Sequence, residues 1–214
     1  VVNTVVGGTI SKITGGKFAN GAFGAAFARA IGEARAGSFS ESHKGNYDES
    51  LITDQKADNT SRTTITLKND KTTLNLNISN ELDGLIGALN SGEQTFSDSI
   101  LGEFGAGVHT LDVDASYQIG YPGLHKNGLI TLNPNAYNSH LGVAQLTLGH
   151  ELIHYRDWLG RGSAWSQQSN LTEHNAYSWE KNNLNRFIQP SVYRDMYQNN
   201  LSRHIADYER ALGR

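Results

Sequence analysis

The chain has no cysteine among its 214 residues, only three prolines and a single methionine. Without cysteine it can form neither a disulfide nor a zinc ribbon, and it can pass between oxidising and reducing compartments unchanged. No internal repeat is present, and the only low-complexity tract is the glycine-rich start. The length predicts one domain plus an N-terminal extension, large enough to bury about 70% of its unfolded surface without help from a metal.

A strong charge of one sign is also missing, since the formal net charge is −3 and no run of Lys or Arg occurs. This composition argues against electrostatic binding to nucleic acid. Hydrophobic runs are short. The most apolar one lies within residues 14–32, falls short of the ~18–20 residues that span a bilayer, and is interrupted by Arg29. It also lacks the charged start of a signal peptide. We expect no nucleic-acid partner and no stable membrane anchor.

The most informative motif is His150-Glu151-Leu152-Ile153-His154. Residues i and i+4 of a helix lie one turn apart on the same face, so both imidazoles can bind one metal ion while the glutamate reaches a water beside it. Either histidine alone would be more typical of a buried, backbone-bonded side chain. Both together, with Glu151 between them, predict the metal site of a zinc hydrolase.

Residues 140–159 are expected to form the helix that carries this motif. Apolar residues recur every three or four positions, which is the spacing of one buried helical stripe. Gly160, followed by Arg161-Gly162-Ser163, indicates a glycine C-cap and a loop. The stripe consists of Leu141, Ala144, Leu148, Leu152, Tyr155 and Leu159.

A catalytic zinc ion takes three protein ligands and leaves one position open, so a third ligand is required. Residues 170–188 have the apolar spacing of a second helix, and Glu173 lies in its first turn. We predict Glu173 as the third ligand. The alternative is a capping box in which Asn170 is the N-cap and Glu173 folds back onto it. The rival ligands are His174, Asp157 and Glu180, and Asp157 could instead accept a hydrogen bond from an imidazole N–H.

His150-Glu151-x-x-His154 followed by Glu173 resembles the gluzincin branch of the zincin metallopeptidases, over residues 150–173 only. The resemblance implies that His150, His154 and Glu173 bind zinc and that Glu151 is the general base. It also implies an upstream edge strand that pairs with the substrate backbone, for which we predict residues 128–133.

Two departures from the zincin pattern stand out. The metzincin extension is absent, because Asp157 and Gly160 occupy its positions. The position of the family's supporting aspartate holds Tyr177, so the support of His150 is unassigned.

The proposed chemistry also needs a donor for the developing oxyanion. Zinc lowers the pKa of water toward about 7, and Glu151 takes the proton and later returns it to the leaving amine. Each donor candidate is individually more typical of a half-buried aromatic or a surface histidine. The candidates, unranked, are Tyr177, Tyr155, Tyr193 and His204.

Residues 14–32, which contain Gly-Gly-Lys-Phe-Ala-Asn-Gly-Ala, resemble the segment that precedes the variable C-terminal toxin in secreted bacterial proteins of the Rhs and filamentous-haemagglutinin type. The resemblance implies that the chain is the toxic end of a polymorphic toxin. It would be cut from a larger carrier protein, delivered into a target cell by a bacterial secretion system, and countered by a cognate immunity protein. We divide the chain into a junction segment, 1–40, and a toxin domain, 41–214.

The middle of the chain is predicted to form the structural scaffold of the domain. Residues 63–68 and 72–78 alternate polar and apolar about Asn69-Asp70-Lys71, which predicts a hairpin. Residues 82–89 indicate a helix, 109–114 a strand and 191–212 a final helix. Asp112 and Asp114 on that strand are expected to face solvent. The inward residues of the hairpin should be Ile65, Leu67, Leu74, Leu76 and Ile78.

These observations predict an α+β, zincin-like fold. A small twisted sheet should pack on the motif helix, with further C-terminal helices and the site in a cleft between them. The leading function is a zinc metallopeptidase toxin that cleaves a protein in the target cell. One alternative is a zinc amidase that acts on cell-wall peptide. Another is a non-catalytic binding domain with a closed, structural metal site, which would need a fourth protein ligand.

Overall fold

A computed structural model describes residues 61–116, 122–134, 140–162 and 168–214. The described residues form one five-stranded sheet and four α-helices, so the α+β prediction is confirmed. The predicted junction segment, 1–40, and the first part of the predicted toxin domain, 41–60, lie outside them. No described helix is both long and apolar enough to cross a membrane.

The predicted hairpin is present as strands β1 (Arg62–Lys68) and β2 (Thr72–Ser79), which pair antiparallel. Asn69 shapes the turn, since its Oδ1 accepts hydrogen bonds from the backbone N–H groups of Lys71 and Thr72 at 3.0 and 2.8 Å. One face of the hairpin is buried and the other is polar. All five predicted inward residues are buried, namely Ile65, Leu67, Leu74, Leu76 and Ile78.

The chain then passes through a 3₁₀ turn and helix α3 (Asp83–Ile100) into strand β3 (Gly107–Ala115), which lies parallel to β2. A second hairpin, β4 (Gly123–Lys126) and β5 (Leu129–Leu132), completes the sheet in the order β1-β2-β3-β5-β4. A 3₁₀ turn, Leu101–Glu103, joins α3 to the loop before β3.

The prediction that residues 128–133 form the edge strand is wrong. β5 occupies these residues but lies inside the sheet, between β3 and β4, and β4 forms the edge. The two-residue turn Asn127-Gly128 joins β4 to β5 with positive φ at both positions, 51° and 85°. A tight hairpin turn of this kind needs such dihedrals, which asparagine and glycine tolerate best. The edge strand therefore precedes the predicted one.

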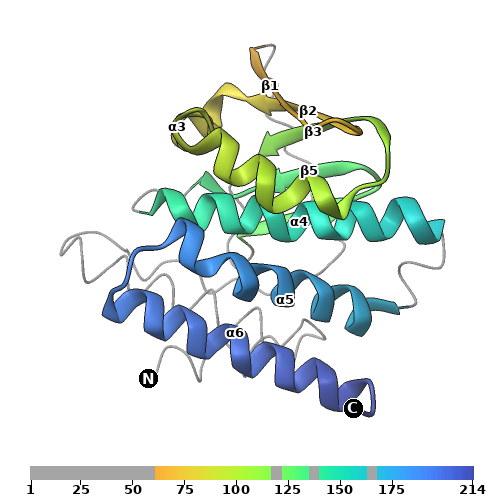
Figure 1. The fold of residues 1–214 in the computed structure, drawn as a ribbon, viewed down its shortest axis with the longest axis vertical. Coiled ribbons are helices and arrows are strands. Elements are labelled where there is room, and N and C mark those ends of the chain that lie inside the picture. The colour runs from red at the N-terminus through yellow and green to blue at the C-terminus, as the bar shows by residue number, and fades with distance from the viewer. Residues whose placement is uncertain (1–60, 117–121, 135–139, 163–167) are drawn as a thin grey trace, which may run out of the picture.

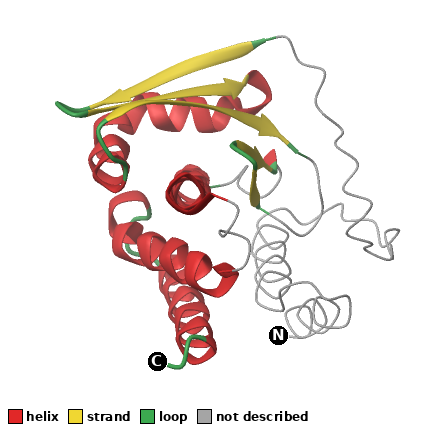
Figure 2. Cartoon of the chain, turned by 90° about the vertical axis from the view of Figure 1, so that its right-hand side faces the viewer, coloured by secondary structure: helices red, strands yellow, loops and turns green. Residues whose placement is uncertain are grey.

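The three remaining helices follow in sequence as α4 (Leu141–Arg161), α5 (Ser169–Phe187) and α6 (Val192–Ala211). All four helices lie on one side of the sheet, where α3 and α4 contact it directly and α5 and then α6 lie farther away (Figures 1 and 2). The predicted stripe of α4 is buried except at its two ends, where Leu141 and Leu159 are exposed. The C-cap of the helix is Gly162, with φ of 55°, and not the predicted Gly160.

The expectation that Asp112 and Asp114 both face solvent is wrong for Asp114. Its side chain is buried, and its Oδ1 accepts a hydrogen bond from Nη2 of Arg62 at 2.5 Å. Arg62 lies on β1 and reaches across β2 to this carboxylate, while Asp112 stays exposed at 3.9 Å from the same guanidinium. The pattern along β3 alone thus predicts a solvated Asp114, but Arg62 on β1 pairs with its carboxylate.

Candidate metal centre

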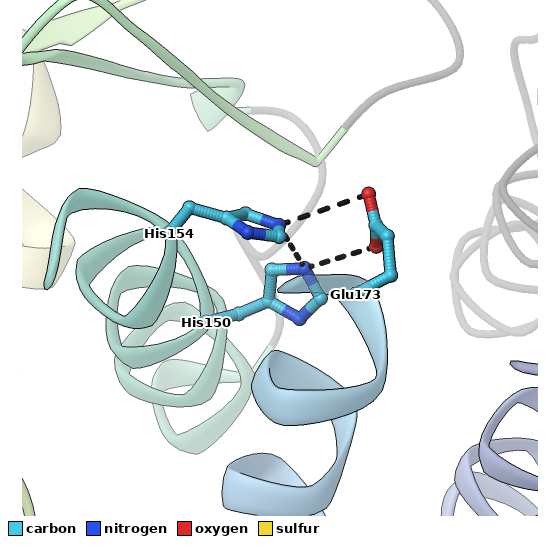
Figure 3. Close-up of side chains that lie close together, drawn as sticks. All are labelled: His150, His154 and Glu173. Atoms are coloured by element: carbon cyan, nitrogen blue, oxygen red, sulfur yellow. Dashed lines mark hydrogen bonds and ion pairs between the residues drawn. The ribbon is translucent and has the colours of Figure 1, made fainter. Parts of the chain in front are cut away.

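Helix α4 carries the motif and is buried along most of its length, from Gly142 to Tyr155. The helix is enclosed because it passes between the sheet on one side and α5 on the other (Figure 1). His150 and His154 lie one turn apart, and both rings project toward α5 (Figure 3). The fold therefore places two imidazoles in a largely dry interior, where polar groups need partners.

Three ligand atoms converge at this point. Nε2 of His150 lies 3.1 Å from Nε2 of His154. The carboxylate of Glu173 lies 3.6 Å from the first of these nitrogens and 3.7 Å from the second (Figure 3). Zinc bonds of about 2.0 to 2.1 Å at tetrahedral angles put neighbouring ligand atoms about 3.3 Å apart. The three side chains thus form a buried group that could hold a metal ion.

Glu173 comes from the first turns of α5, as predicted. The helix begins at Ser169, its N-cap is Gln168, and Asn170 lies inside it. No side chain caps this end of the helix, so the alternative in which Asn170 and Glu173 form a capping box is wrong. The carboxylate is buried against the two imidazoles.

Glycines on α4 allow α5 to approach closely enough for this contact. A Cβ on Gly142 would lie 2.1 Å from the carbonyl oxygen of Phe187, and one on Gly149 would lie 1.9 Å from the indole ring of Trp179. These glycines are seven residues apart and therefore share a helix face. Trp179 is held in turn from α3, because its Nε1 donates to the carbonyl of Ser99 at 3.0 Å.

Glu180 contacts His150 from outside the group that could hold a metal ion. Its Oε1 lies 2.5 Å from Nδ1 of His150, on the opposite side of the ring from the ligand nitrogen. Its Oε2 accepts a hydrogen bond from the hydroxyl of Tyr197 at 2.6 Å. Glu180 follows Glu173 by seven residues, so one face of α5 supplies both carboxylates. The support that the sequence left unassigned therefore comes from two turns farther along α5.

The electrostatics of the group favour a positive charge. Burial by itself lowers the pKa of His150, but hydrogen bonds to Glu173 and Glu180 and the nearby charge of Glu151 outweigh it and raise the pKa to about 10. A buried imidazolium is costly unless carboxylates surround it. The same carboxylates would stabilise a divalent cation in place of the proton.

Glu151, the predicted base, is buried on the side of α4 that faces β4. A Cβ on Gly123 would lie 2.7 Å from its Oε1 and 2.9 Å from its Cγ, so the carboxylate occupies space that only glycine leaves open. Gly123 is the first residue of the edge strand. The candidate base thus lies between the motif helix and the edge of the sheet.

Two of the rival ligands lie elsewhere. Asp157 accepts hydrogen bonds from Asn175 at 3.0 Å and from the Arg156 guanidinium. It thus ties α4 to α5 and does not hold an imidazole. Nε2 of His174 lies 3.6 Å from Glu209 on α6. Neither residue belongs to the group of His150, His154 and Glu173.

Of the four oxyanion candidates, Tyr177 lies against a member of the group that could hold a metal ion. Its ring lies edge-on to His150, with centroids 4.7 Å apart, and stacks on His204 at 4.7 Å. Burial and the Glu173 carboxylate raise the pKa of the Tyr177 phenol, so it keeps its proton. Tyr155 packs instead against Trp158 and His125, and Tyr193 stacks on His140.

Contributors to the site that were not predicted include Gly123, Trp179 and Tyr197. The turn Asn127-Gly128 was a usable signal for the hairpin that contains Gly123. Tyr197 had no local signal, since its contact with Glu180 depends on how α6 packs against α5.

No protein-family model matches the chain, and no curated protein shows significant sequence similarity to it. The assignment of a function therefore depends on the chemistry of this group of side chains.

Proposed function

We propose that the chain is a zinc metallopeptidase. The observation that carries the proposal is the convergence of His150, His154 and Glu173, with Glu151 in the same helical turn. Two imidazoles and one carboxylate are a donor set that zinc accepts readily. With an open position, zinc lowers the pKa of water toward about 7 and polarises a carbonyl group.

Residues of the chain perform the other functions that the proposed reaction needs. Glu151 is the base that takes a proton from the attacking water and gives it to the leaving amine. Glu180 holds Nδ1 of His150 and thereby leaves Nε2 as the coordinating atom. Burial keeps water away from these charges, which strengthens their interactions with a reacting group.

The position of Glu151 supports a peptide as substrate. It lies against Gly123 at the start of β4, whose outer side forms the edge of the sheet. An extended peptide can add to such an edge through backbone hydrogen bonds, which would bring its carbonyl groups past the base. A peptide bond is therefore favoured over an unrelated amide.

An open coordination position is supported by the number of ligands. Among the described residues, the group contains three members, one fewer than a closed tetrahedral site needs. The side chains also keep some solvent contact, with 11%, 8% and 8% of His150, His154 and Glu173 exposed. Both facts favour a catalytic site over a structural one.

The biological setting is proposed from residues 14–32. Their resemblance to the junction ahead of polymorphic toxins suggests an effector that is released from a carrier, cleaves a protein in the target cell and is neutralised by an immunity protein. This segment lies outside the described residues, so the setting is independent of the geometry of the metal centre.

The test compares wild type with Glu151→Gln in a target cell, with Glu93→Gln as a matched control at an exposed carboxylate on α3. Mass spectrometry of new protein N-termini should find cleavage products with wild type and Glu93→Gln only. Zinc content should be equal in all three proteins, because Glu151 is not a ligand. Cleavage by Glu151→Gln would refute the proposal, and release of cell-wall fragments without new protein N-termini would point to an amidase.

A further inference from the structure

Helix α6 supplies no residue to the group that could hold a metal, yet a hydrogen bond from this helix reaches the carboxylate that contacts His150. The hydroxyl of Tyr197 donates to Oε2 of Glu180 at 2.6 Å, and Oε1 of the same carboxylate lies 2.5 Å from Nδ1 of His150. Tyr197 and Glu180 are each 4% exposed. The three side chains therefore form a buried chain from α6 through α5 to α4.

We propose that Tyr197 is a positioning residue of the metal centre, which sets metal affinity by fixing the Glu180 carboxylate that orients His150. The inference rests on the metal site of the proposed function and extends it to a residue that touches neither metal nor substrate.

The physical reason lies in the geometry of a carboxylate with two partners. A histidine coordinates through Nε2 only when its proton lies on Nδ1, and an acceptor at Nδ1 selects that tautomer and holds the ring plane. A carboxylate held at one oxygen alone can rotate about its terminal torsion, which is a soft one. The Tyr197 hydroxyl holds the second oxygen, so Oε1 stays directed at His150.

Tyr197 is suited to this role because it acts as a donor. Burial and the Glu180 carboxylate raise the pKa of its phenol well above the ordinary value, so the hydroxyl keeps its proton. A hydrogen bond from a neutral donor to a buried carboxylate is among the stronger kinds in proteins. If this donor were removed, Oε2 of Glu180 would lose the hydrogen bond from Tyr197 in a nearly dry interior.

The neighbouring Tyr193 provides a natural comparison. It lies one turn earlier on α6, and its ring is 6.3 Å from that of Tyr197. The two hydroxyls differ, because that of Tyr193 is buried and has no hydrogen-bond partner among the described residues. Removal of the hydroxyl while the ring remains should therefore affect the metal centre at position 197 and not at position 193.

The experiment measures the zinc dissociation constant of the full chain by competition with a chromogenic chelator. Tyr197→Phe should bind zinc about 10- to 100-fold more weakly, the range typical of lost support around a metal ligand, and Tyr193→Phe should bind as wild type does. In a Glu180→Ala background, Tyr197→Phe should cause no further loss, because it acts through Glu180.

An equal affinity of Tyr197→Phe and wild type would overturn the inference, as would an undiminished effect of Tyr197→Phe in the Glu180→Ala background. Thermal melts in excess chelator show whether a loss of affinity merely follows a loss of fold. If Tyr197→Phe does not fold, NMR of the zinc-loaded wild type tests the same contact. The proton of His150 must then lie on Nδ1 and the Tyr197 hydroxyl proton must be protected from exchange. A rapidly exchanging hydroxyl would overturn the inference.

This result is separable from the proposed function. A chain that shows the affinity differences but cleaves nothing refutes the peptidase and leaves the role of Tyr197 intact. If the chain cleaves protein in a Glu151-dependent way and Tyr197→Phe binds zinc as wild type does, the peptidase is supported and the role of Tyr197 is refuted.

Discussion

The indole of Trp179 fills the space that a side chain on Gly149 would require, since a Cβ there would lie 1.9 Å from Cη2 of the indole. Gly149 immediately precedes the candidate ligand His150, and Trp179 immediately precedes Glu180, which contacts Nδ1 of His150. This one contact therefore sets the separation of α4 and α5 where the metal centre is built.

Gly149→Ala should push the two helices apart. We expect a loss of about 3 kcal/mol in the free energy of unfolding, because overpacking in a closed interface costs about that much. Zinc affinity should fall as well. The matched control is Gly160→Ala on the same helix, where a Cβ meets nothing within 4 Å and alanine should stabilise by about 0.5 to 1 kcal/mol. Denaturant unfolding measures both, and equal stability of the two variants would contradict the packing argument.

Gly123→Ala should reduce activity while sparing the metal and the fold. The added Cβ would lie 2.7 Å from Oε1 of Glu151 and 3.0 Å from Cγ2 of Thr147, and the flexible carboxylate would move first. Displacement of a catalytic base costs about a factor of 10² or more in rate. Gly105→Ala, where a Cβ meets nothing within 4 Å, is the control. Normal zinc content with full activity in Gly123→Ala would show that Glu151 is not the base.

Glu173→Gln should weaken zinc binding by more than about a hundredfold, because it replaces a charged ligand with a neutral amide in a buried group. His174→Gln should bind zinc normally, since this imidazole lies toward Glu209 and outside the group. Zinc added at about 100 times its dissociation constant should stabilise wild type by about 2.7 kcal/mol. Thermal melts with and without zinc measure the difference, and a normal zinc response in Glu173→Gln would assign the third ligand elsewhere.

His125 should make stability depend on pH below neutrality. Burial lowers its pKa from 6.5 to about 4, and its Nε2 accepts the backbone N–H of Gly128 at 3.1 Å. Below pH 6.5 the unfolded chain takes up a proton that the folded chain does not. The free energy of unfolding therefore falls between pH 6.5 and about 4, by about 3 kcal/mol in total. Above pH 6.5, His125 does not make the free energy of unfolding depend on pH.

The measurement is the difference between wild type and His125→Gln, whose amide oxygen can still accept the Gly128 N–H. Burial also lowers the pKa values of His140 and His204, and the difference removes their common contribution. The raised pKa of His150 acts in a separate window, from 6.5 to about 10, where the metal-free protein loses stability as pH rises. Identical slopes for the two proteins below pH 6.5 would contradict a buried neutral His125.

The convergence of His150, His154 and Glu173 and most of the elements could be predicted because their signals are local. Alternation over residues 63–78 identifies a hairpin with one buried face, and His150 to His154 is the spacing of one helical turn. Glu173 required only that the next helix turn back, which a short connection favours.

The parts that could not be predicted depend on contacts between distant segments. The buried pair of Arg62 and Asp114 joins β1 to β3, and no periodicity along either strand contains it. Helix α3 continues to Ile100, beyond the expected residues 82–89, because Phe96 and Ile100 at its far end are buried in the core. Tyr197 reaches Glu180 only because α6 packs against α5.

The candidate ligands, the acid that steadies one of them and the phenol behind that acid all fall within a single uninterrupted stretch, from His150 to Tyr197. Contacts between segments so near in sequence close only short loops, which costs little chain entropy and favours fast formation. An ion could therefore be captured as soon as three consecutive helices have assembled. The edge strand that presents Gly123 to Glu151 comes from outside this stretch. The chain would therefore be able to bind the ion before it could use the ion in catalysis.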